Sequence, residues 1–137
     1  MYAKRSVDLA IYRIDKADEC LKEARDNLQI GNYGAAANRS YYAIFNAMRS
    51  MLNLEGDDYK KHSGVIAEFR MRYLKTGILP RSLSRIIRNL FDLRNSSDYD
   101  DFYVVSKDQV EKQTADAAVF IETVRECLMK RIESDLD

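Results

Sequence analysis

The chain has 137 residues, of which 46% are hydrophobic and 32% are charged, and its formal net charge is zero. This length and balance are typical of one globular domain, which we expect to span residues 1–137. Cys20 and Cys127 lie in helical patterns without a CxxC or Cys/His cluster, which argues against a disulfide framework and a zinc site. No apolar stretch approaches the roughly 20 residues of a membrane span, and no signal peptide is recognisable. We therefore expect a cytoplasmic protein with no membrane partner, no metal and no cofactor.

Charged residues are segregated along the chain although their sum is zero. Residues 60–94 hold nine Lys and Arg against two Asp and Glu, whereas residues 95–137 hold five against eleven. A basic middle beside an acidic tail is compatible with an anion-binding groove next to a solvated acidic helix. The alternative is that the segments neutralise one another when packed, and net charge alone does not decide between the two.

Apolar residues recur at spacings of three and four in the first half of the chain. The first stripe predicts a long helix over about 6–29, which ends at Gly31-Asn32, with Asn32 capping the next helix. The second helix starts at Tyr33 and stops near residues 55–58. A shorter helix follows Ser63 and closes at residues 76–77.

Pro80 opens a fourth predicted helix, whose apolar stripe ends in an arginine: Leu83, Ile87, Leu90 and Arg94. Residues 98–105 are predicted to form a loop. Ser106 and Gln109 then form the capping box of a last helix. No segment is long enough for a paired strand, so the predicted fold class is all-α, an antiparallel bundle of four to five helices.

Two groups of residues stand apart from core building. On the second helix, Asn38 lies about one turn before Tyr41 and Tyr42, and polar groups on an apolar face need partners. These three residues are candidates for the wall of a ligand site. The alternative is a Tyr-rich core helix whose hydroxyls are satisfied internally.

The second group surrounds Arg94, whose guanidinium extends an apolar stripe and needs a carboxylate, a phosphate or a partner surface. Asp98 and Tyr99, one turn later, are expected to reach the same space. An Arg94–Asp98 or Arg94–Asp100 pair that merely closes the helix is the alternative.

The only histidine, His62, follows Lys60 and Lys61 and precedes the third helix. Capping or packing is the ordinary role of such a histidine. Lys61, His62 and Arg88 are the remaining ligand-site candidates, because they would contact phosphate if they line a groove at Arg94. The face of Arg81, Arg85 and Arg88 is otherwise a solvated helix face.

Three segments resemble successive signatures of the HEPN superfamily: NRSYYAIF at 38–45, KHSGVI at 61–66 and RNSSDYD at 94–100. The resemblance covers nearly the whole chain. It is closest to small stand-alone HEPN proteins, which are often paired with a minimal nucleotidyltransferase.

The resemblance implies a helical bundle that forms a homodimer, with two copies of the arginine motif facing each other. Many members are metal-independent RNases or toxins of toxin–antitoxin pairs, and their motif is Arg, a polar residue, a few further residues and His. Arg94 and Asn95 match this motif, but Tyr99 stands where a histidine is expected, next to Asp98. RNA cleavage needs a proton-transfer group that titrates near neutral pH, as histidine does and an unperturbed tyrosine, with a pKa of about 10, does not.

Three functions are therefore compatible with the sequence. The first is an RNA- or nucleotide-binding, toxin-like dimer that works with a minimal nucleotidyltransferase. The second is an endoribonuclease that uses Arg94, Asn95, Asp98 and Tyr99. The third is a purely structural dimerisation module. The missing histidine ranks binding above catalysis, and Tyr99, with Tyr59 and Tyr103 as exposed alternatives, is a candidate acceptor of a nucleotide.

Overall fold

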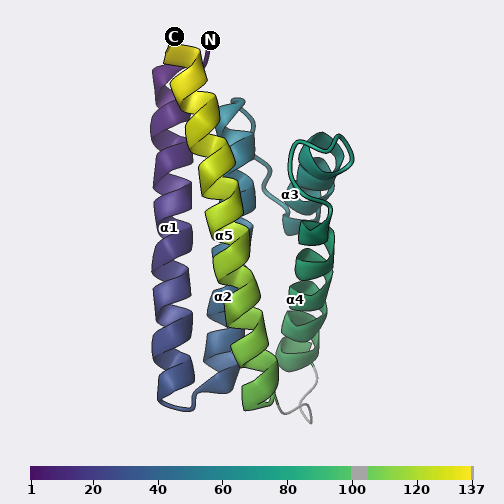
Figure 1. The fold of residues 1–137 in the computed structure, drawn as a ribbon. Helices are drawn as coiled ribbons and strands as arrows, with labels where there is room; N and C mark the ends of the chain where they lie inside the picture. The colour runs from purple at the N-terminus through teal and green to yellow at the C-terminus, as the bar shows by residue number, and fades with distance from the viewer. Residues whose placement is uncertain (100–104, 137) are drawn as a thin grey trace.

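A computed structural model of the chain describes residues 1–99 and 105–136, apart from the side chains of residues 91 and 94–99. Every regular element in this part of the chain is a helix, as predicted, and no strand occurs among the described residues. Figure 1 shows three long helices side by side: α1 (Lys4–Gln29), α2 (Tyr33–Leu54) and α5 (Lys107–Leu136). The shorter α3 (His62–Phe69) and α4 (Ser82–Tyr99) cover one side of this group. Among the described residues, α1 packs on α2 and α5 and on no other helix.

The turn between α1 and α2 lies where the sequence predicts it. Gly31 adopts a φ of 82°, a left-handed conformation that glycine takes without steric cost. Asn32 occupies the N-cap position of α2, but its side chain makes no capping hydrogen bond, so that part of the prediction is wrong. Its ψ of 74° departs from the extended backbone of a capping residue, which normally aims the side-chain oxygen at the first turn.

The third predicted helix consists of two parts. α3 ends at Phe69, and the π-helix η1 (Arg70–Leu74) continues it. The amide of Lys75 donates to the carbonyl oxygen of Arg70 at 2.9 Å, which closes a wide turn. Phe69, Tyr73 and Leu74 are all buried, so the wide turn keeps three apolar side chains in the core.

The apolar stripe of α4 faces the core of its own chain. Leu83, Ile87 and Leu90 are each at most 3% exposed and belong to the main core cluster. The helix runs on to Tyr99, so the prediction of a loop from residue 98 is wrong for Asp98 and Tyr99. No Gly or Pro interrupts this stretch, and nothing therefore stops the helix there. Val105, the last residue of the predicted loop, is not helical, and residues 100–104 lie outside the described residues.

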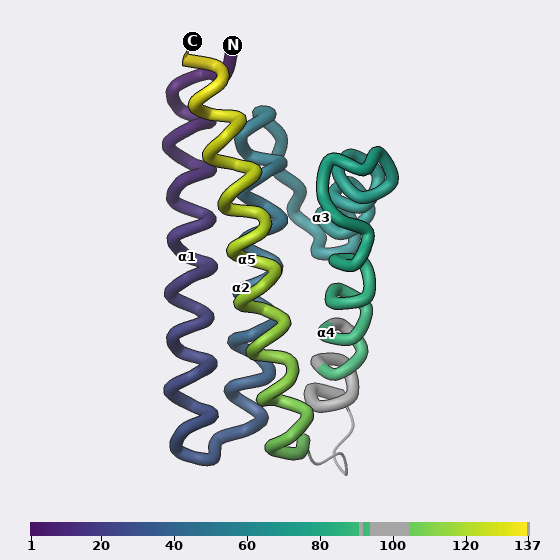
Figure 2. Tube along the Cα trace, viewed as in Figure 1, coloured from purple at the N-terminus to yellow at the C-terminus, as the bar shows by residue number. Residues whose placement is uncertain are grey.

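The start of α5 confirms the predicted capping box. The amide of Gln109 donates to the Ser106 hydroxyl at 3.2 Å, and the amide of Ser106 donates to the Gln109 side-chain oxygen at 3.0 Å. The far end of α5 returns to the start of the chain, as Figure 2 shows. There the amide of Tyr2 donates to a carboxylate oxygen of Asp135 at 2.8 Å. Both chain ends thus lie at the end of the bundle opposite the α1–α2 turn.

Candidate functional site

The four residues predicted to carry the motif chemistry lie in the last turns of α4: Arg94, Asn95, Asp98 and Tyr99. Their backbone is helical, and their side chains lie outside the described residues. Leu90, one turn before Arg94, is buried in the main core. Leu93, the residue before Arg94, packs against a second, smaller core cluster that includes Ala36 and Ala37 of α2. The motif therefore begins where α4 meets the first turns of α2.

His62 is held by a tyrosine of α2. The Tyr41 hydroxyl and His62 Nδ1 share a hydrogen bond of 3.0 Å between residues that are 21 positions apart in the sequence. Tyr41 is 4% exposed, and His62, the first residue of α3, is half-buried. The pair brings together two of the predicted ligand-site residues, and it fixes the orientation of the imidazole ring.

Aromatic rings enclose the imidazole on two further sides. The Phe45 ring centroid lies 4.0 Å from that of His62, and the Tyr42 ring meets His62 edge-on at 5.9 Å. Tyr41 and Phe45 are stacked, as expected for residues one helical turn apart. Phe45 was not among the predicted site residues. Its position four residues after Tyr41 is the signal that places it on the same face.

Asn38 lies close to this aromatic cluster but is already engaged. Its side-chain oxygen accepts hydrogen bonds from two nitrogens of Arg39, at 2.9 and 3.3 Å. The Arg39 guanidinium also lies over the Tyr42 ring, 5.0 Å from its centroid, and 3.9 Å from a carboxylate oxygen of Glu23. Asn38 thus orients Arg39 over the aromatic cluster, a role that its position in the sequence did not suggest.

A hollow of about 270 Å³ opens beside His62, lined by Phe45, Arg49, Asp58, Tyr59, Lys60 and His62. Arg49 and Asp58 form a close pair on its wall, in which Nη2 of Arg49 lies 2.9 Å from Oδ1 and 2.8 Å from Oδ2 of Asp58. Lys60 is exposed at its rim. Arg49 and Asp58 were not predicted as site residues, because nine positions separate them and the turn between α2 and α3 brings them together.

Tyr59 departs from the prediction of an exposed loop residue. It lies in a loop, but it is half-buried, and its hydroxyl accepts a hydrogen bond from Arg72 at 3.0 Å. The guanidinium of Arg72 also bonds Glu55, Asp57 and Glu68, so the ring of Tyr59 is held in a network of charged side chains. The other alternative acceptor, Tyr103, lies outside the described residues.

The remaining predicted ligand residues are not brought into the same hollow. Lys61 is exposed at the N-cap of α3. Arg88 is exposed on α4 and lines a different hollow with Ser63 and Ile66, between α3 and α4. The candidate site is therefore centred on Tyr41, Tyr42 and His62.

The described residues include no cluster of His, Cys, Asp or Glu that is suited to hold a metal ion. Within the same ranges, none of the helices is both long and apolar enough to cross a membrane.

Comparison with known proteins agrees with the resemblance noted in the sequence. The family model described as the HEPN domain matches residues 10–127. A UPF0332 protein of Archaeoglobus fulgidus is 33% identical over 118 residues, which cover 86% of this chain and 94% of the relative. A UPF0332 protein of Thermotoga maritima is 29% identical over 113 residues, which cover 82% of this chain and 86% of the relative.

A third relative carries a functional name. It is the protein "Putative toxin MJ0142" of Methanocaldococcus jannaschii, which is 29% identical over 119 residues. The match covers 86% of this chain and 80% of that protein. All three matches thus extend over most of both chains.

Proposed function

The chain belongs to the HEPN family, and from this premise we propose that it is a toxin-like, RNA- or nucleotide-binding homodimer that works with a minimal nucleotidyltransferase. The relatives that are named as toxins support the toxin-like part of the proposal. The aromatic and cationic residues around His62 support the binding part.

The observation that carries the proposal is the position of His62 between three aromatic rings and several cations. Proteins that bind single-stranded nucleic acid combine rings, on which bases stack, with cations that contact the backbone. Here His62 and Tyr42 are half-buried rings, and Arg39, Arg49 and Lys60 lie next to the cluster. This combination suits a nucleotide or a short stretch of RNA.

Binding ranks above catalysis because of the residue at position 99. A histidine in the motif would supply a proton-transfer group near neutral pH, whereas an unperturbed tyrosine, with a pKa of about 10, does not. The only histidine lies on α3 and is already hydrogen-bonded to Tyr41. A guanidinium such as that of Arg94 can hold a phosphate without any proton transfer.

Endoribonuclease activity is the second candidate, and the Tyr41–His62 hydrogen bond favours it. An imidazole held by a second group is oriented as catalytic histidines are. The base would take the proton of a ribose 2′-hydroxyl, and the 2′-oxygen would form a bond to phosphorus. The bond from phosphorus to the 5′-oxygen would break, and that oxygen would receive a proton. Arg94 would stabilise the charge on the phosphorane.

A purely structural dimerisation module is the third candidate. An exposed apolar stripe on α4 would support this candidate, because it could pack against a second chain. Leu83, Ile87 and Leu90 are instead buried in the core of their own chain. The homodimer therefore rests on the family alone.

RNA binding and cleavage assays separate these candidates. We expect the wild type to bind a labelled single-stranded RNA at low salt without cleaving it, and Arg94→Ala and His62→Ala to bind it more weakly. Lys4→Ala is the matched control, because it removes an exposed cation from α1, and it should bind the RNA as the wild type does. RNA cleavage that is lost in His62→Ala would establish the nuclease instead. If the wild type binds no RNA even at low salt, RNA is removed as a ligand.

Incubation with a cognate nucleotidyltransferase and ATP, followed by mass spectrometry, tests the partnership. In the acceptor reaction the Tyr99 hydroxyl oxygen would attack the α-phosphorus, pyrophosphate would leave, and the phenolic proton would pass to a base. An adduct that disappears in Tyr99→Phe would establish this role. We expect instead that Tyr99→Phe keeps the fold and changes ligand affinity by about 0.5–1.5 kcal/mol, the contribution of one hydrogen bond.

A further inference from the structure

The π-helix η1 brings two cations to the same side of the chain. Its closing hydrogen bond joins the backbone of Arg70 to that of Lys75, so the two residues are one wide turn apart. Both side chains line a notch of about 450 Å³ between η1 and the start of α4. Arg81, Leu74 and Ser84 complete the lining. Three cations therefore meet at one notch, although eleven positions separate the first from the last.

The described residues offer this notch no compensating negative charge. No carboxylate lines it, and none of its three cations forms an ion pair within the ranges that the structure describes. The Nε atom of Arg70 is buried and has no hydrogen-bond partner there. Arg72, two residues later, instead contacts three carboxylates. Three neighbouring cations without a described carboxylate beside them give the notch the chemistry of an anion site.

A second hollow adjoins the notch at Arg70 and extends to Ser63, the neighbour of His62. This hollow, of about 320 Å³, lies between α3 and α4. Its lining is apolar in the middle, at Ile66, Ala67 and Ile87, with Arg88 on one wall. It reaches Ser63, the neighbour of His62 in the chain, and Asp92, the one carboxylate among its described lining residues. We call these two joined hollows the α3–α4 groove.

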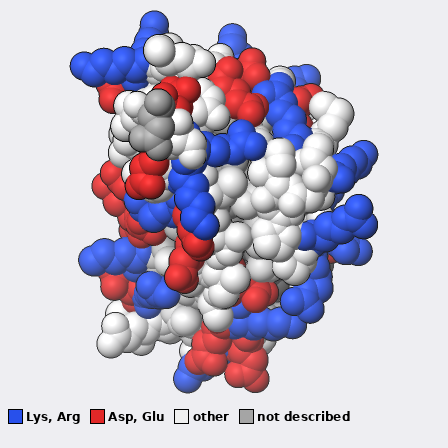
Figure 3. All heavy atoms as spheres, turned by 45° about the horizontal axis from the view of Figure 1, so that its top comes forward, with Lys and Arg blue, Asp and Glu red and all other residues white. Residues whose placement is uncertain are grey.

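Figure 3 shows Lys and Arg side chains gathered along the right-hand edge of the molecule, the side on which α3 and α4 lie in Figure 1. Arg81, which precedes α4, lines the notch, and Arg88, on α4, lines the second hollow; both are exposed. At a helical rise of 1.5 Å per residue, their separation of seven residues corresponds to about 10 Å. The cations of the two hollows therefore lie along the groove rather than at a single point.

We propose that the α3–α4 groove binds the backbone of a single-stranded RNA. One phosphate occupies the notch of Arg70, Lys75 and Arg81, and the strand runs over the apolar floor towards His62. This inference rests on the proposed RNA-binding function and names the surface that the strand follows. A recessed groove with an apolar floor between cations fits a strand whose phosphates and bases alternate, and it fits a flat lipid surface less well.

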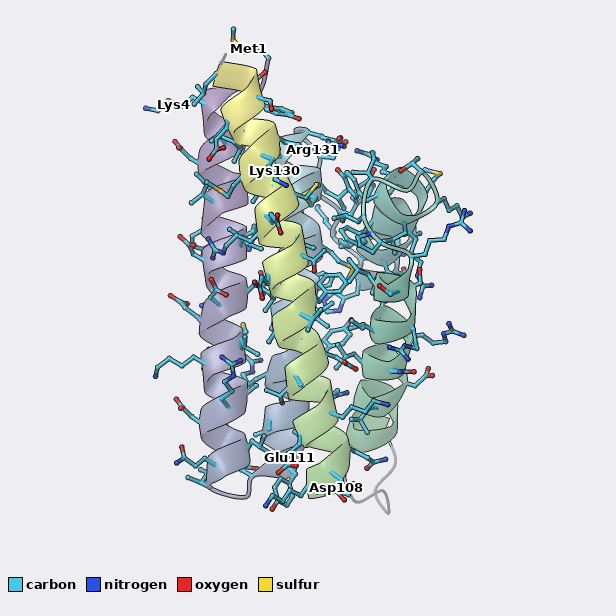
Figure 4. All side chains as sticks on the ribbon, viewed as in Figure 1. Met1, Lys4, Asp108, Glu111, Lys130 and Arg131 are labelled. Atoms are coloured by element: carbon cyan, nitrogen blue, oxygen red, sulfur yellow. The ribbon has the colours of Figure 1, made fainter. Side chains whose placement is uncertain are left out.

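The test is the salt dependence of RNA binding, measured by fluorescence anisotropy on the full chain with a labelled single-stranded RNA. The double variant Lys75→Gln, Arg81→Gln removes two exposed cations that have no described ion pair, so the fold should be retained. The matched control is Lys4→Gln, Arg25→Gln, which removes two exposed cations from α1, a helix that does not contact α3 or α4. Figure 4 shows Lys4 pointing away from the α3–α4 side.

We expect the groove variant to bind with a several-fold higher Kd. The slope of log Kd against log salt should fall by about 0.7, since one phosphate occupies the notch and each phosphate contact of a single strand contributes about 0.7. Arg70→Gln should change binding in the same direction, and the α1 control should match the wild type.

Four results would overturn the inference. If the groove variant keeps the wild-type slope while His62→Ala weakens binding, the groove is not the RNA track, but the proposed function stands. If both double variants lose affinity equally, the effect is only one of net charge. If the groove variant loses binding to vesicles of anionic lipid but keeps its RNA affinity, the groove contacts a membrane surface. A wild type that binds no RNA would remove the proposed function and this inference together.

Discussion

The hydrogen bond between Tyr41 and His62 is the clearest case of a residue whose role depends on tertiary contacts. It joins α2 to the first residue of α3, with 3.0 Å between the Tyr41 hydroxyl oxygen and His62 Nδ1. Tyr41 is 4% exposed. Its energy therefore contributes both to the stability of the chain and to the orientation of the imidazole.

Tyr41→Phe is expected to lower the free energy of unfolding by about 0.5–1.5 kcal/mol, because only the hydroxyl is lost and the ring still fills its place. Urea unfolding measures the change. Tyr12→Phe is the matched control, since Tyr12 is 55% exposed and should change stability by less than the measurement error. An equal effect of both substitutions would mean that the Tyr41–His62 contact contributes nothing.

The thiol of Cys20 lies in a different environment from that of Cys127. Cys20 is 2% exposed, and burial raises the pKa of its thiol, whereas Cys127 is half-buried. The thiolate is the nucleophile, and a raised pKa keeps Cys20 protonated as the pH rises through the ordinary thiol range.

Thiol labelling of the native protein at mildly alkaline pH should therefore show one reactive cysteine, Cys127, and one slow cysteine, Cys20. Both should react at once in denaturant, and Cys127→Ser should remove the fast phase. A fast phase that persists in Cys127→Ser would contradict the buried position of Cys20.

Among the elements, α4 differs most from what its sequence suggested. Its apolar stripe ends in Arg94, which the sequence predicts to need a carboxylate, a phosphate or a partner surface, and the described side chains of the stripe lie in the core of the same chain. An apolar face of a helix must pack against another surface. The sequence of the helix does not show whether that surface belongs to the same chain or to a partner.

Leu90→Ala tests this assignment, because Leu90 is 2% exposed in the core of its own chain. We expect the free energy of unfolding to fall by about 2–5 kcal/mol, the usual effect of truncating a buried leucine. The molecular mass in solution should stay that of the wild type. Ile78→Ala is the control, since Ile78 is 45% exposed and should have a much smaller effect. A change of oligomeric state with little loss of stability would place Leu90 at an interface instead.

At the scale of the whole molecule, some charges pair across segments, as Arg72 does with Glu55 and Asp57, whereas others gather on one side. Arg70, Lys75, Arg81 and Arg88 border the α3–α4 groove, and the acidic tail forms part of α5. A chain can therefore have a locally basic side even though its net charge is zero.

We expect the protein to be a two-fold homodimer with the C-terminal turns of α4 near the interface, as its family membership implies. Light scattering at tens of micromolar should then give about twice the mass of one 15.9 kDa chain. Arg94→Ala should lower the dimer fraction if the two motifs face each other. A single chain at the same concentrations would contradict this assembly.

Local patterns in the sequence were sufficient to predict the helices. Apolar spacing of three and four, Gly31 at a turn and the Ser106–Gln109 capping box depend on residues within one or two turns, so they could be interpreted without the fold. The family could also be predicted, since three short segments in a defined order carry it. The extent of α4 was missed at Asp98 and Tyr99, because polar residues of low helix propensity were interpreted as a loop.

The surroundings of the site were decided only by tertiary structure. The contact of His62 with Tyr41 and Phe45, the Arg49–Asp58 pair and the meeting of Arg70, Lys75 and Arg81 at one notch all join residues from separate elements. Helical periodicity states which face a residue occupies, but not which neighbour covers that face. The covering neighbour follows from how the helices pack, and that packing determines whether a cation lies in solvent, in an ion pair or in a groove.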